Sequence, residues 1–356
     1  MEQLDLPRIG MLPAGELDSI GDVPGVTVGH FTLAQGARQT GVTVVRPHEG
    51  DPFRNKVPAA ATVLNGFGKS CGLIQVEELG VLETPIALTN TFAVGAVANA
   101  QIRQAIAANP EIGRAWPTVN PLVFECNDGY LNDIQAQAVA EAHYEQAWRG
   151  AASVFEQGSV GAGRGMSSFG FKGGIGSASR LAEAYPGQRY TVGALVLSNF
   201  GQRSSMTIAG RPFGRRLAAA ARDGEPAGQP EKGSIILLLA TDAPLDSRQL
   251  RRLSLRAGAG LARTGSVFGH GSGDIALAFS TAYTIPHLAE RGMPVQVMLH
   301  ETRIDALFEA AAEAVEQAIV AALWRAETVA GRDGHVRRAI REAAPQWRQW
   351  LGETAF

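Results

Sequence analysis

A serine at the junction of a polar and an apolar segment has the most unusual surroundings of any residue that could do chemistry here. Residues 221–233 read ARDGEPAGQPEKG, with two prolines, three glycines and no large apolar side chain, whereas Ser234 is followed at once by IILLLA. This contrast predicts an exposed, mobile loop that leads directly into a buried strand. The Ser234 hydroxyl would therefore lie at the boundary between a flexible segment and the protein core.

A base that could activate this hydroxyl is not obvious. A GxSxG motif is absent, a Ser/His/Asp triad stays possible by residue count, and a Ser/Lys dyad would need Lys69 or Lys172. Cleavage of the Gly233–Ser234 bond would create a base, because a free α-amino group has a pKa of ~7.7–8.0 and could accept the hydroxyl proton at neutral pH. The alternative interpretation, which stays open, is that Gly-Ser simply ends a loop before a strand.

A glycine-rich stretch at positions 160–180, VGAGRGMSSFGFKGGIGSASR, raises the question of phosphate binding. It does not match a dinucleotide-binding fingerprint, because Met166 stands where the third glycine should be, nor a P-loop, because Gly173 follows Lys172. We therefore favour a tight loop packed closely on another backbone. No two histidines have the spacing of a zinc site and the two cysteines stand far apart, so the sequence predicts neither a metal nor an organic cofactor.

The elements that must position these residues are short apolar runs and amphipathic segments in irregular order. Seven runs are expected to form strands, several of them buried on both faces: 41–45, 61–64, 85–89, 190–199, 234–240, 274–280 and 295–300. Four segments have a helical pattern: 91–108, 132–148, 247–263 and 302–329, the last followed by Gly331 as a stop. The mixture predicts an α/β fold in which sheets are layered with helices.

Composition narrows the class of protein. The 356 residues are 45% hydrophobic and 19% charged, and no repeat or low-complexity tract divides them, so one large domain is favoured over two. A net charge of −2 argues against nucleic-acid binding and favours a small molecule or a protein as partner. The first residues lack a basic segment followed by an apolar one, and no apolar run approaches a membrane span, so we expect a soluble, cytoplasmic protein.

Several motifs, in order along residues 21–300, resemble one family. They are GDVPGVTVGHFT, IQVEELGVLETPIALTNTFAVG, ECNDGYLND, FGFKGGIGSASR, LVLSNFGQR, KGSIILLLATDAPL and GLARTGSVFGHGSGDIALAFST. Together they are similar to the L-aminopeptidase/D-esterase family, which includes the β-aminopeptidases. The resemblance implies a fold like that of the N-terminal-nucleophile hydrolases, a four-layer αββα sandwich formed by residues 1–356 as a single domain. It also implies one self-cleavage between Gly233 and Ser234, which gives an α subunit (1–233) and a β subunit (234–356) that begins with the nucleophile.

Five further residues receive a role from the resemblance. Asn199 of SNFG matches the asparagine whose amide helps to bind the oxyanion, and Asn127 of ECND stands where some members have an oxyanion-site tyrosine. Ser272 and Asp274 of GSGD match a second serine and an acid, a glutamate in some members, that would orient the new α-ammonium group or relay its proton. Glu125 matches the carboxylate that receives the substrate's free amino group. Taken alone, Asn199 could be a turn former and Glu125 a buried, paired acid.

The resemblance thus implies a self-processing serine aminopeptidase with amidase or esterase activity. It would act without metal or cofactor on small peptides, amides or esters with a free amine, with Ser234 attacking the carbonyl group of the first residue. Homo-oligomers are expected, since the relatives form tetramers. Two alternatives stay open: an acyltransferase resembling the ornithine acetyltransferases, whose second subunit starts with Thr, and an uncleaved, non-catalytic binding or scaffold protein. The sequence does not predict whether L-, D- or β-amino acids are preferred.

Overall fold

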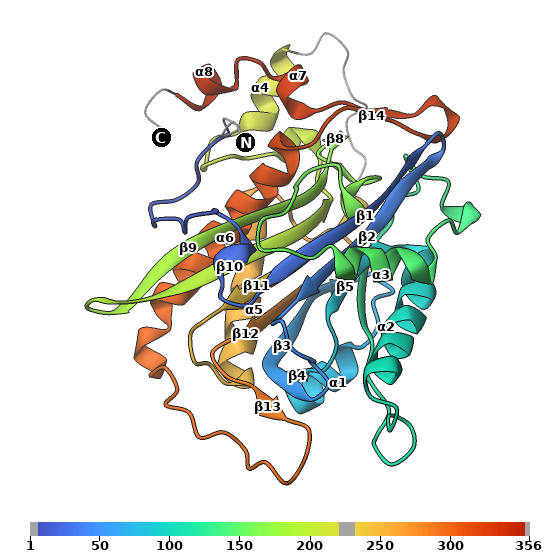
Figure 1. Cartoon of the computed structure of the whole chain (residues 1–356). Helices are drawn as coiled ribbons and strands as arrows, with labels where there is room; N and C mark the ends of the chain where they lie inside the picture. The colour runs from blue at the N-terminus through green and yellow to red at the C-terminus, as the bar shows by residue number, and fades with distance from the viewer. Residues whose placement is uncertain (1–5, 221–231, 353–356) are drawn as a thin grey trace.

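Two β-sheets lie face to face with helices on both outer sides (Figure 1). The computed structural model describes residues 6–220 and 232–352. Separate apolar cores fill the space between the sheets and the space between each sheet and its helices. The molecule is therefore the four-layer αββα sandwich that the family resemblance implies.

The two sheets differ in size. The smaller one has the strand order β1 (Thr27–Gln35), β2 (Arg38–Arg46), β5 (Ile86–Asn90) and β6 (Leu122–Cys126). The larger one has the order β13 (Ile285–Pro286), β3 (Asn55–Gly66), β12 (Gly271–Ser280), β11 (Lys232–Thr241), β10 (Gln188–Asn199) and β9 (Gly174–Tyr185), with β4 (Val81–Leu82) also paired to β3. Two small ladders join β7 (Ser167–Ser168) to β8 (Phe171–Lys172) and β14 (Val329–Ala330) to β15 (Val336–Arg337).

The long helices form the outer layers. The helices α5 (Ser247–Arg263) and α6 (Asp305–Trp324) pack on the larger sheet, and α2 (Val94–Ala108) and α3 (Glu141–Arg149) pack on the smaller one (Figure 1). The others are α1 (Leu73–Leu79), α4 (Phe213–Ala220), α7 (Ile340–Ala343) and α8 (Trp347–Leu351). None of the helices in the described ranges is long and apolar enough to cross a membrane.

Strand β11 lies in the middle of the larger sheet and shows why its sequence is apolar at every position. Ile235 and Leu237 belong to the core beneath α5 and α6, whereas Ile236 and Leu238 belong to the core between the sheets, together with Phe124 of β6. Successive side chains of a strand point to opposite faces, so a strand covered on both sides needs an unbroken apolar run. The first residues of this strand are thereby fixed in the centre of the molecule.

The second half of the glycine-rich stretch forms strand β9, against which α6 packs closely. A Cβ atom added to Gly176 would lie 1.9 Å from the backbone oxygen of Ala318 in α6, and one added to Gly174 would lie 2.0 Å from the backbone oxygen of Gly158. Close packing on another backbone is therefore confirmed for this stretch. It occurs within a strand, however, and not only in a loop.

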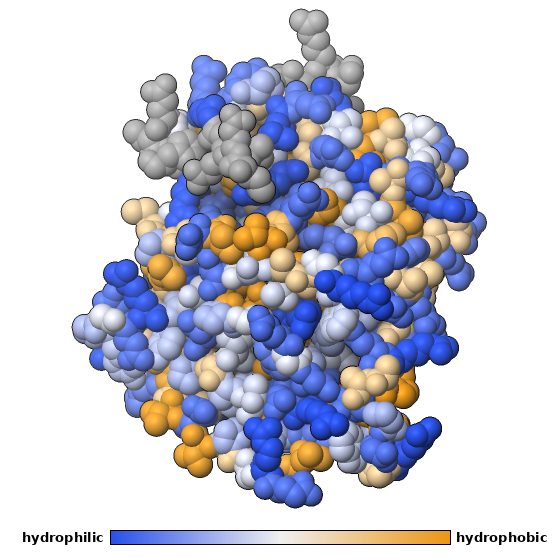
Figure 2. Space-filling model, viewed as in Figure 1, coloured by the Kyte–Doolittle hydropathy of each residue, from blue (hydrophilic) through white to orange (hydrophobic). Residues whose placement is uncertain are grey.

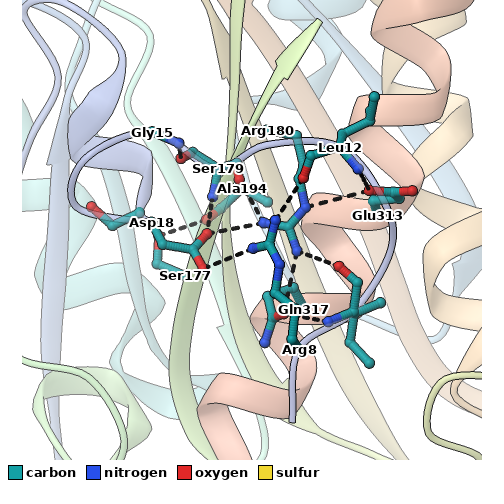
Figure 3. A network of polar contacts seen from close by, with 12 residues as sticks. Arg8, Leu12, Gly15, Asp18, Ser177, Ser179, Arg180, Ala194, Glu313 and Gln317 are labelled. Atoms are coloured by element: carbon teal, nitrogen blue, oxygen red, sulfur yellow. Dashed lines mark hydrogen bonds and ion pairs between the residues drawn. The ribbon is translucent and has the colours of Figure 1, made fainter. Parts of the chain in front are cut away.

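The N-terminal segment is tied to β9 and α6 by a buried arginine (Figure 3). The Arg180 guanidinium donates hydrogen bonds to Asp18 Oδ1 at 3.0 Å and to the backbone oxygen of Ile9 at 2.6 Å, and its Nε lies 3.4 Å from Glu313 Oε2. Gln317 Oε1 accepts hydrogen bonds from the Ile9 N–H at 2.7 Å and from Arg180 at 3.2 Å. The segment before β1 thus contacts a helix some 300 positions away in the sequence.

The expected elements agree with the structure in most places. Strands cover the predicted runs at 41–45, 61–64, 190–199, 234–240 and 274–280 and all but the first residue of 85–89, α5 has the predicted bounds, and 91–108 contains α2. Most of the predicted loop at 221–233 lies outside the described residues, and its last two residues begin β11.

Three expected elements were wrong in whole or in part. The segment 295–300 is irregular, with Val295 97% and Val297 90% exposed, because no strand in the described ranges pairs with its backbone. Of 132–148 only the part from Glu141 onward is a regular α-helix, and the helix predicted over 302–329 ends at Trp324, before β14. An apolar or alternating pattern is not sufficient where the tertiary neighbour is missing.

On the face drawn in Figure 2, apolar side chains do not form one large patch. Figure 2 shows a face on which hydrophilic residues predominate and hydrophobic residues form several separate groups. The most exposed large apolar residues in the described part of the chain are Val295, Met11, Val297 and Ile74. Scattered apolar residues of this kind are normal on a folded protein.

Candidate active site

The residues singled out in the sequence meet where three strands of the larger sheet begin or end. Ser234 is near the start of β11, Asn199 is the last residue of β10, and Gly273 is near the start of β12. In the ladders, Ser234 lies directly opposite both Asn199 and Gly273. The end of β6 in the other sheet, with Glu125, lies close by, so the site is at one end of the sandwich.

The Ser234 side chain is held by the neighbouring strand. Its Oγ accepts a hydrogen bond from the Gly273 N–H at 3.1 Å, and only 7% of the residue is exposed. The preceding residue needs to be glycine for two reasons: Gly233 has a φ of +134°, and an added Cβ would lie 2.1 Å from the Asn199 backbone oxygen. The backbone of Gly233, directly before the serine, is therefore held in a conformation that other residues rarely adopt.

Neither lysine considered for a Ser/Lys dyad is hydrogen-bonded to this hydroxyl. Lys172 is fully buried and its Nζ donates to the backbone oxygens of Gly163 at 2.8 Å and Gly173 at 2.9 Å. Burial lowers the pKa of Lys172 well below its usual value. The Lys69 ammonium lies 4.2 Å from the centre of the Phe67 ring. Both side chains stabilise the segments that surround the site.

The Asn199 amide has a fixed orientation. Its Oδ1 accepts a hydrogen bond from the Ser167 N–H at 2.8 Å, and its Nδ2 donates one to the backbone oxygen of Asn127 at 3.0 Å. An amide that accepts at one end and donates at the other cannot be turned over without losing both bonds, and the NH₂ group has a second hydrogen to offer. The geometry suits a preorganised donor beside Ser234.

The structure brings the backbone of Asn127 to the site, whereas its side chain is directed to its own loop. The residue is exposed, and its Oδ1 accepts a hydrogen bond from the Gly129 N–H at 2.9 Å. The next residue, Asp128, is buried and its Oδ1 accepts from Asn132 Nδ2 at 3.0 Å. Burial raises the pKa of Asp128 to about 6, and hydrogen bonds from Thr40 and Asn132 oppose this rise. The backbone oxygen of Asn127 in this turn therefore helps to fix the orientation of the Asn199 amide.

Ser272 and Asp274 flank the Gly233–Ser234 bond on the adjacent strand. Ser272 lies opposite Gly233 in the parallel ladder and Asp274 lies opposite Ile235, and both residues are buried. The Ser272 hydroxyl donates a hydrogen bond to Asp274 Oδ1 at 2.5 Å. Asn65 of β3 donates from its Nδ2 to the Ser272 backbone oxygen. The hydroxyl and the carboxylate are thus already coupled, next to the place where a new amine would appear.

Glu125 is a buried carboxylate whose hydrogen-bonding partners are neutral. Its Oε1 accepts from the Lys69 backbone N–H at 2.7 Å, its Oε2 accepts from the Thr91 hydroxyl, and only 4% of the residue is exposed. A Cβ added to Gly68 would lie 3.6 Å from Glu125 Oε1 and 3.8 Å from Gly273 Cα, so the carboxylate is close to the strand that holds Ser234. Among the described residues no basic side chain forms an ion pair with it. A cationic ligand group would give it a partner.

The residues that hold this carboxylate were not predicted from the sequence. Thr91 directly follows β5, Lys69 follows β3, and β5 lies parallel to β6 with Thr89 opposite Glu125. A signal was present, because residues that follow neighbouring parallel strands meet at the same edge of a sheet. It could not be used while β6 itself was not recognised as a strand.

The four-layer sandwich, with the Ser234 hydroxyl held at the start of a central strand, agrees with the N-terminal-nucleophile hydrolase fold. The sequence model of Peptidase family S58 matches residues 18–337. The chain therefore belongs to peptidase family S58.

Relatives agree with this assignment along nearly the whole chain. The β-peptidyl aminopeptidase BapA of Sphingosinicella microcystinivorans is 39% identical over 352 residues, which cover 92% of this chain and 87% of the relative. The crystal structure of the PH0078 protein of Pyrococcus horikoshii OT3 is 47% identical, with a TM-score of 0.90 and 97% of each chain covered. The L-aminopeptidase D-Ala-esterase/amidase of Ochrobactrum anthropi, described as a prototype of the serine aminopeptidases and a variant of the Ntn hydrolase fold, is 36% identical, with a TM-score of 0.86 and 97% of each chain covered. The chain is a hydrolase, a serine aminopeptidase with the amidase and esterase character of its family.

Proposed function

We propose that the chain cuts itself once, between Gly233 and Ser234, and that Ser234 then hydrolyses the bond after the first residue of substrates with a free amine. The observation that supports this most is the position of Ser234, opposite Asn199 and Gly273 and directly after a glycine with a φ of +134°. Residues 1–356 would form a single domain that is made of an α subunit, 1–233, and a β subunit, 234–356. A bond held directly beside a buried hydroxyl, after a glycine in a conformation closed to other residues, suits self-cleavage.

The proposed self-cleavage needs only the serine and water. The Ser234 hydroxyl adds to the carbonyl carbon of Gly233 as the C–N bond breaks, so the hydroxyl proton passes to the departing nitrogen and an ester links the two residues. Water then hydrolyses this ester, which leaves a carboxylate on Gly233 and both a free hydroxyl and a free amine on Ser234. The cut would give fragments of 233 and 123 residues.

The new amine is the proposed base for substrate hydrolysis. It takes the hydroxyl proton as Oγ attacks the substrate carbonyl, Asn199 donates a hydrogen bond to the developing oxyanion, and the proton then moves to the leaving amine or alcohol. Water then attacks the ester of the acyl-enzyme while the amine accepts a proton from it. This step releases the acyl group as a carboxylic acid and restores the Ser234 hydroxyl. Ser272 and Asp274 would hold the ammonium form between these steps. Activity should rise from neutral to mildly alkaline pH, because the amine must be deprotonated to act as base.

Glu125 is proposed to receive the substrate's amino group. A buried carboxylate with only neutral partners gains a charge-assisted hydrogen bond when an ammonium group arrives, whereas a blocked amine would leave it buried without that partner. The relatives are a β-peptidyl aminopeptidase and an L-aminopeptidase D-Ala-esterase/amidase. We propose short peptides, amides and esters with a free α- or β-amino group as substrates.

Two wider proposals rest on the family and on the sequence. Homo-oligomers, tetramers as in the relatives, are proposed from the resemblance. A cytoplasmic location is proposed because Cys71 and Cys126 are both free thiols, as is usual in a reducing compartment.

The decisive experiment is a denaturing gel and an activity assay of Ser234→Ala. Wild type should give two bands, of 233 and 123 residues, and Ser234→Ala one full-length band without activity on an aminoacyl p-nitroanilide. Ser204→Ala is the matched control, since Ser204 is exposed and should leave both the cut and the activity unchanged. Cleavage of Ser234→Ala at the same bond would show that Ser234 is not the nucleophile. A single wild-type band would show that the chain does not cut itself at this bond.

A further inference from the structure

We propose that Arg337 binds the C-terminal carboxylate of the substrate, so that the preferred peptides are dipeptides whose carboxylate lies one residue beyond the bond that is cut. This inference rests on the proposed function, because it needs Glu125 to hold the amine and Ser234 to be the nucleophile. It adds to that function a second charged contact, at the leaving-group end of the site.

The order of the strands places the charged groups on opposite sides of Ser234. Across the larger sheet the order is β3, β12, β11, β10, β9. The segment that follows β3 holds Glu125 through the Lys69 N–H, whereas the segment that precedes β9 holds Asn199 through the Ser167 N–H. A carboxylate therefore lies on the β12 side of the hydroxyl, and the oxyanion donor lies on the β10 side.

Ser167 connects this donor to an arginine. Its N–H donates to Asn199 Oδ1 at 2.8 Å, and its Oγ accepts a hydrogen bond from Arg337 Nε at 3.2 Å. One residue, Ser167, therefore links the guanidinium to the Asn199 amide that would bind the carbonyl oxygen. Because one extended residue spans roughly 3.3–3.6 Å, a substrate held by its carbonyl group at Asn199 can present the carboxylate of the next residue to this arginine.

The guanidinium is placed by the loops that form the site. Arg337 lies over the ring of Tyr130, 3.6 Å from its centre, and His335 stacks on the same tyrosine at 4.5 Å. His335 Nδ1 also lies 2.8 Å from the Tyr130 backbone oxygen, and Arg332 Nε donates to the Gly129 backbone oxygen at 2.6 Å. The β14–β15 hairpin is therefore docked on the loop that begins at Asn127, and Tyr130, which is 39% exposed, places the arginine at the rim of the site.

The charge pattern complements a dipeptide in its zwitterionic form. A planar guanidinium suits a carboxylate because it can donate two parallel hydrogen bonds to it. Glu125 at the other side suits an ammonium. A longer peptide would extend past Arg337 and lose this contact, and an amide or anilide would not make it.

The test compares leaving groups that differ in one charge. We choose an aminoacyl residue that wild type accepts as its p-nitroanilide, and prepare its dipeptide with alanine as the free acid and as the C-terminal amide. Wild type should cleave the acid about tenfold or more better than the amide in kcat/KM, mainly through KM. Arg337→Leu should lower kcat/KM for the acid to the level of the amide, and this loss should be much larger than any change in anilide hydrolysis.

Arg338→Leu is the matched control. This adjacent arginine directly follows β15, its side chain is 64% exposed, and its Nε lies 3.9 Å from Glu342 Oε2. It should keep the preference for the acid. Equal rates for acid and amide in wild type, or a preference that survives in Arg337→Leu, would overturn the proposal while anilide hydrolysis still supports the proposed function.

Two other results would also count against the inference. If Arg337→Leu slows the anilide as much as the acid, the arginine acts only through Ser167 and Asn199 and does not bind the carboxylate. If wild type hydrolyses no substrate with a free amine, including the anilide, the proposed function itself fails and the inference fails with it.

Discussion

At the scale of single residues, the orientation of one amide has the largest chemical consequence. Asn199 could present either its oxygen or its NH₂ group to a substrate carbonyl, and only the second would stabilise negative charge. The Ser167 N–H at one end and the Asn127 backbone oxygen at the other select the NH₂ orientation. If Asn199 is the oxyanion donor, as proposed, no reorganisation is needed when the charge develops.

We expect Asn199→Ala to lower turnover by roughly 100- to 1000-fold, the usual effect of removing one oxyanion donor. Asn127→Ala should cost much less, because the contact with Asn199 comes from the backbone oxygen, which the substitution keeps. Steady-state rates on an aminoacyl p-nitroanilide measure both effects. An unchanged rate in Asn199→Ala would make that residue a turn former only. Equal losses in the two variants would assign the Asn127 side chain a direct role.

A second residue-scale prediction concerns recognition of the amine. Glu125→Gln should raise KM for substrates with a free amine, while self-cleavage continues because it involves no free amine in the attacking step. Wild type should not cleave the N-acetyl form of the same anilide. Glu77→Gln, at an exposed position 62% accessible and 3.9 Å from Arg251, is the control and should behave as wild type. Efficient hydrolysis of the acetylated compound by wild type would contradict the role given to Glu125.

At the scale of elements, the contact between α6 and β9 depends on the absence of a side chain at Gly176. A Cβ there would lie 1.9 Å from the Ala318 oxygen and 2.6 Å from the Ala322 nitrogen, both backbone atoms of α6 that cannot move independently. The helix would have to shift away from the sheet, and with it the buried core that α6 shares with β9, β10 and α5.

Gly176→Ala should therefore destabilise the fold by about 1–3 kcal/mol, as overpacking of a core usually does. Gly95→Ala is the control, because Gly95 is exposed in the first turn of α2 and an added Cβ would have no atom within 4 Å. Denaturant unfolding of both variants in the Ser234→Ala background, which should keep the chain in one piece, would measure the difference. Equal stability of the two variants would show that α6 tolerates displacement.

Strands β11 and β9 and helix α5 show which parts of the structure could be predicted from sequence. Strand β11 was recognised because a strand that is buried on both faces is apolar throughout, and α5 was recognised from the helical pattern of its residues. In the structure a capping box between Asp246 and Gln249 begins this helix. Strand β9 was not recognised, since its glycines and serines resemble a loop and are explained only by the helix that packs on them. The composition of this segment does not reveal which helix packs on it.

Only part of the site could likewise be predicted from the sequence. The positions of Ser234, Asn199 and Glu125 followed from motifs, and the structure brings them to one end of the sandwich. The groups that orient them, such as the Ser167 N–H and the Asn127 carbonyl, are backbone atoms, which any side chain could carry. Arg337 comes from a hairpin more than 130 positions after Asn199, so only the fold shows that it lies nearby.

At the scale of the whole molecule, the two proposed fragments share one sheet. Strand β11 of the second fragment pairs with β10 of the first, and β12 of the second pairs with β3 of the first. The N-terminal segment is also bound to α6 through Arg180, Glu313 and Gln317 (Figure 3). Separation of the fragments would expose the core on both sides of the sheet.

We therefore expect the cut protein to stay one particle in native conditions. Size-exclusion chromatography should elute both fragments in a single peak, at the same volume as uncut Ser234→Ala, and a denaturing gel of that peak should show two bands. The fragments 1–233 and 234–356, produced separately, should each be poorly folded by circular dichroism. Elution of the fragments at different volumes would contradict the interleaved arrangement.

The strand order also has a consequence for the timing of activity in the cell. The surroundings of the Gly233–Ser234 bond include Gly273 and Asp274 of β12, and the hairpin that braces the Asn127 loop is made of residues beyond 328. A ribosome must have released almost the whole chain before these parts can meet. If the bond is cut as proposed, a growing or misfolded chain carries no free amine at Ser234 and so lacks the base proposed for substrate hydrolysis. The cut would then occur only in molecules that have finished folding.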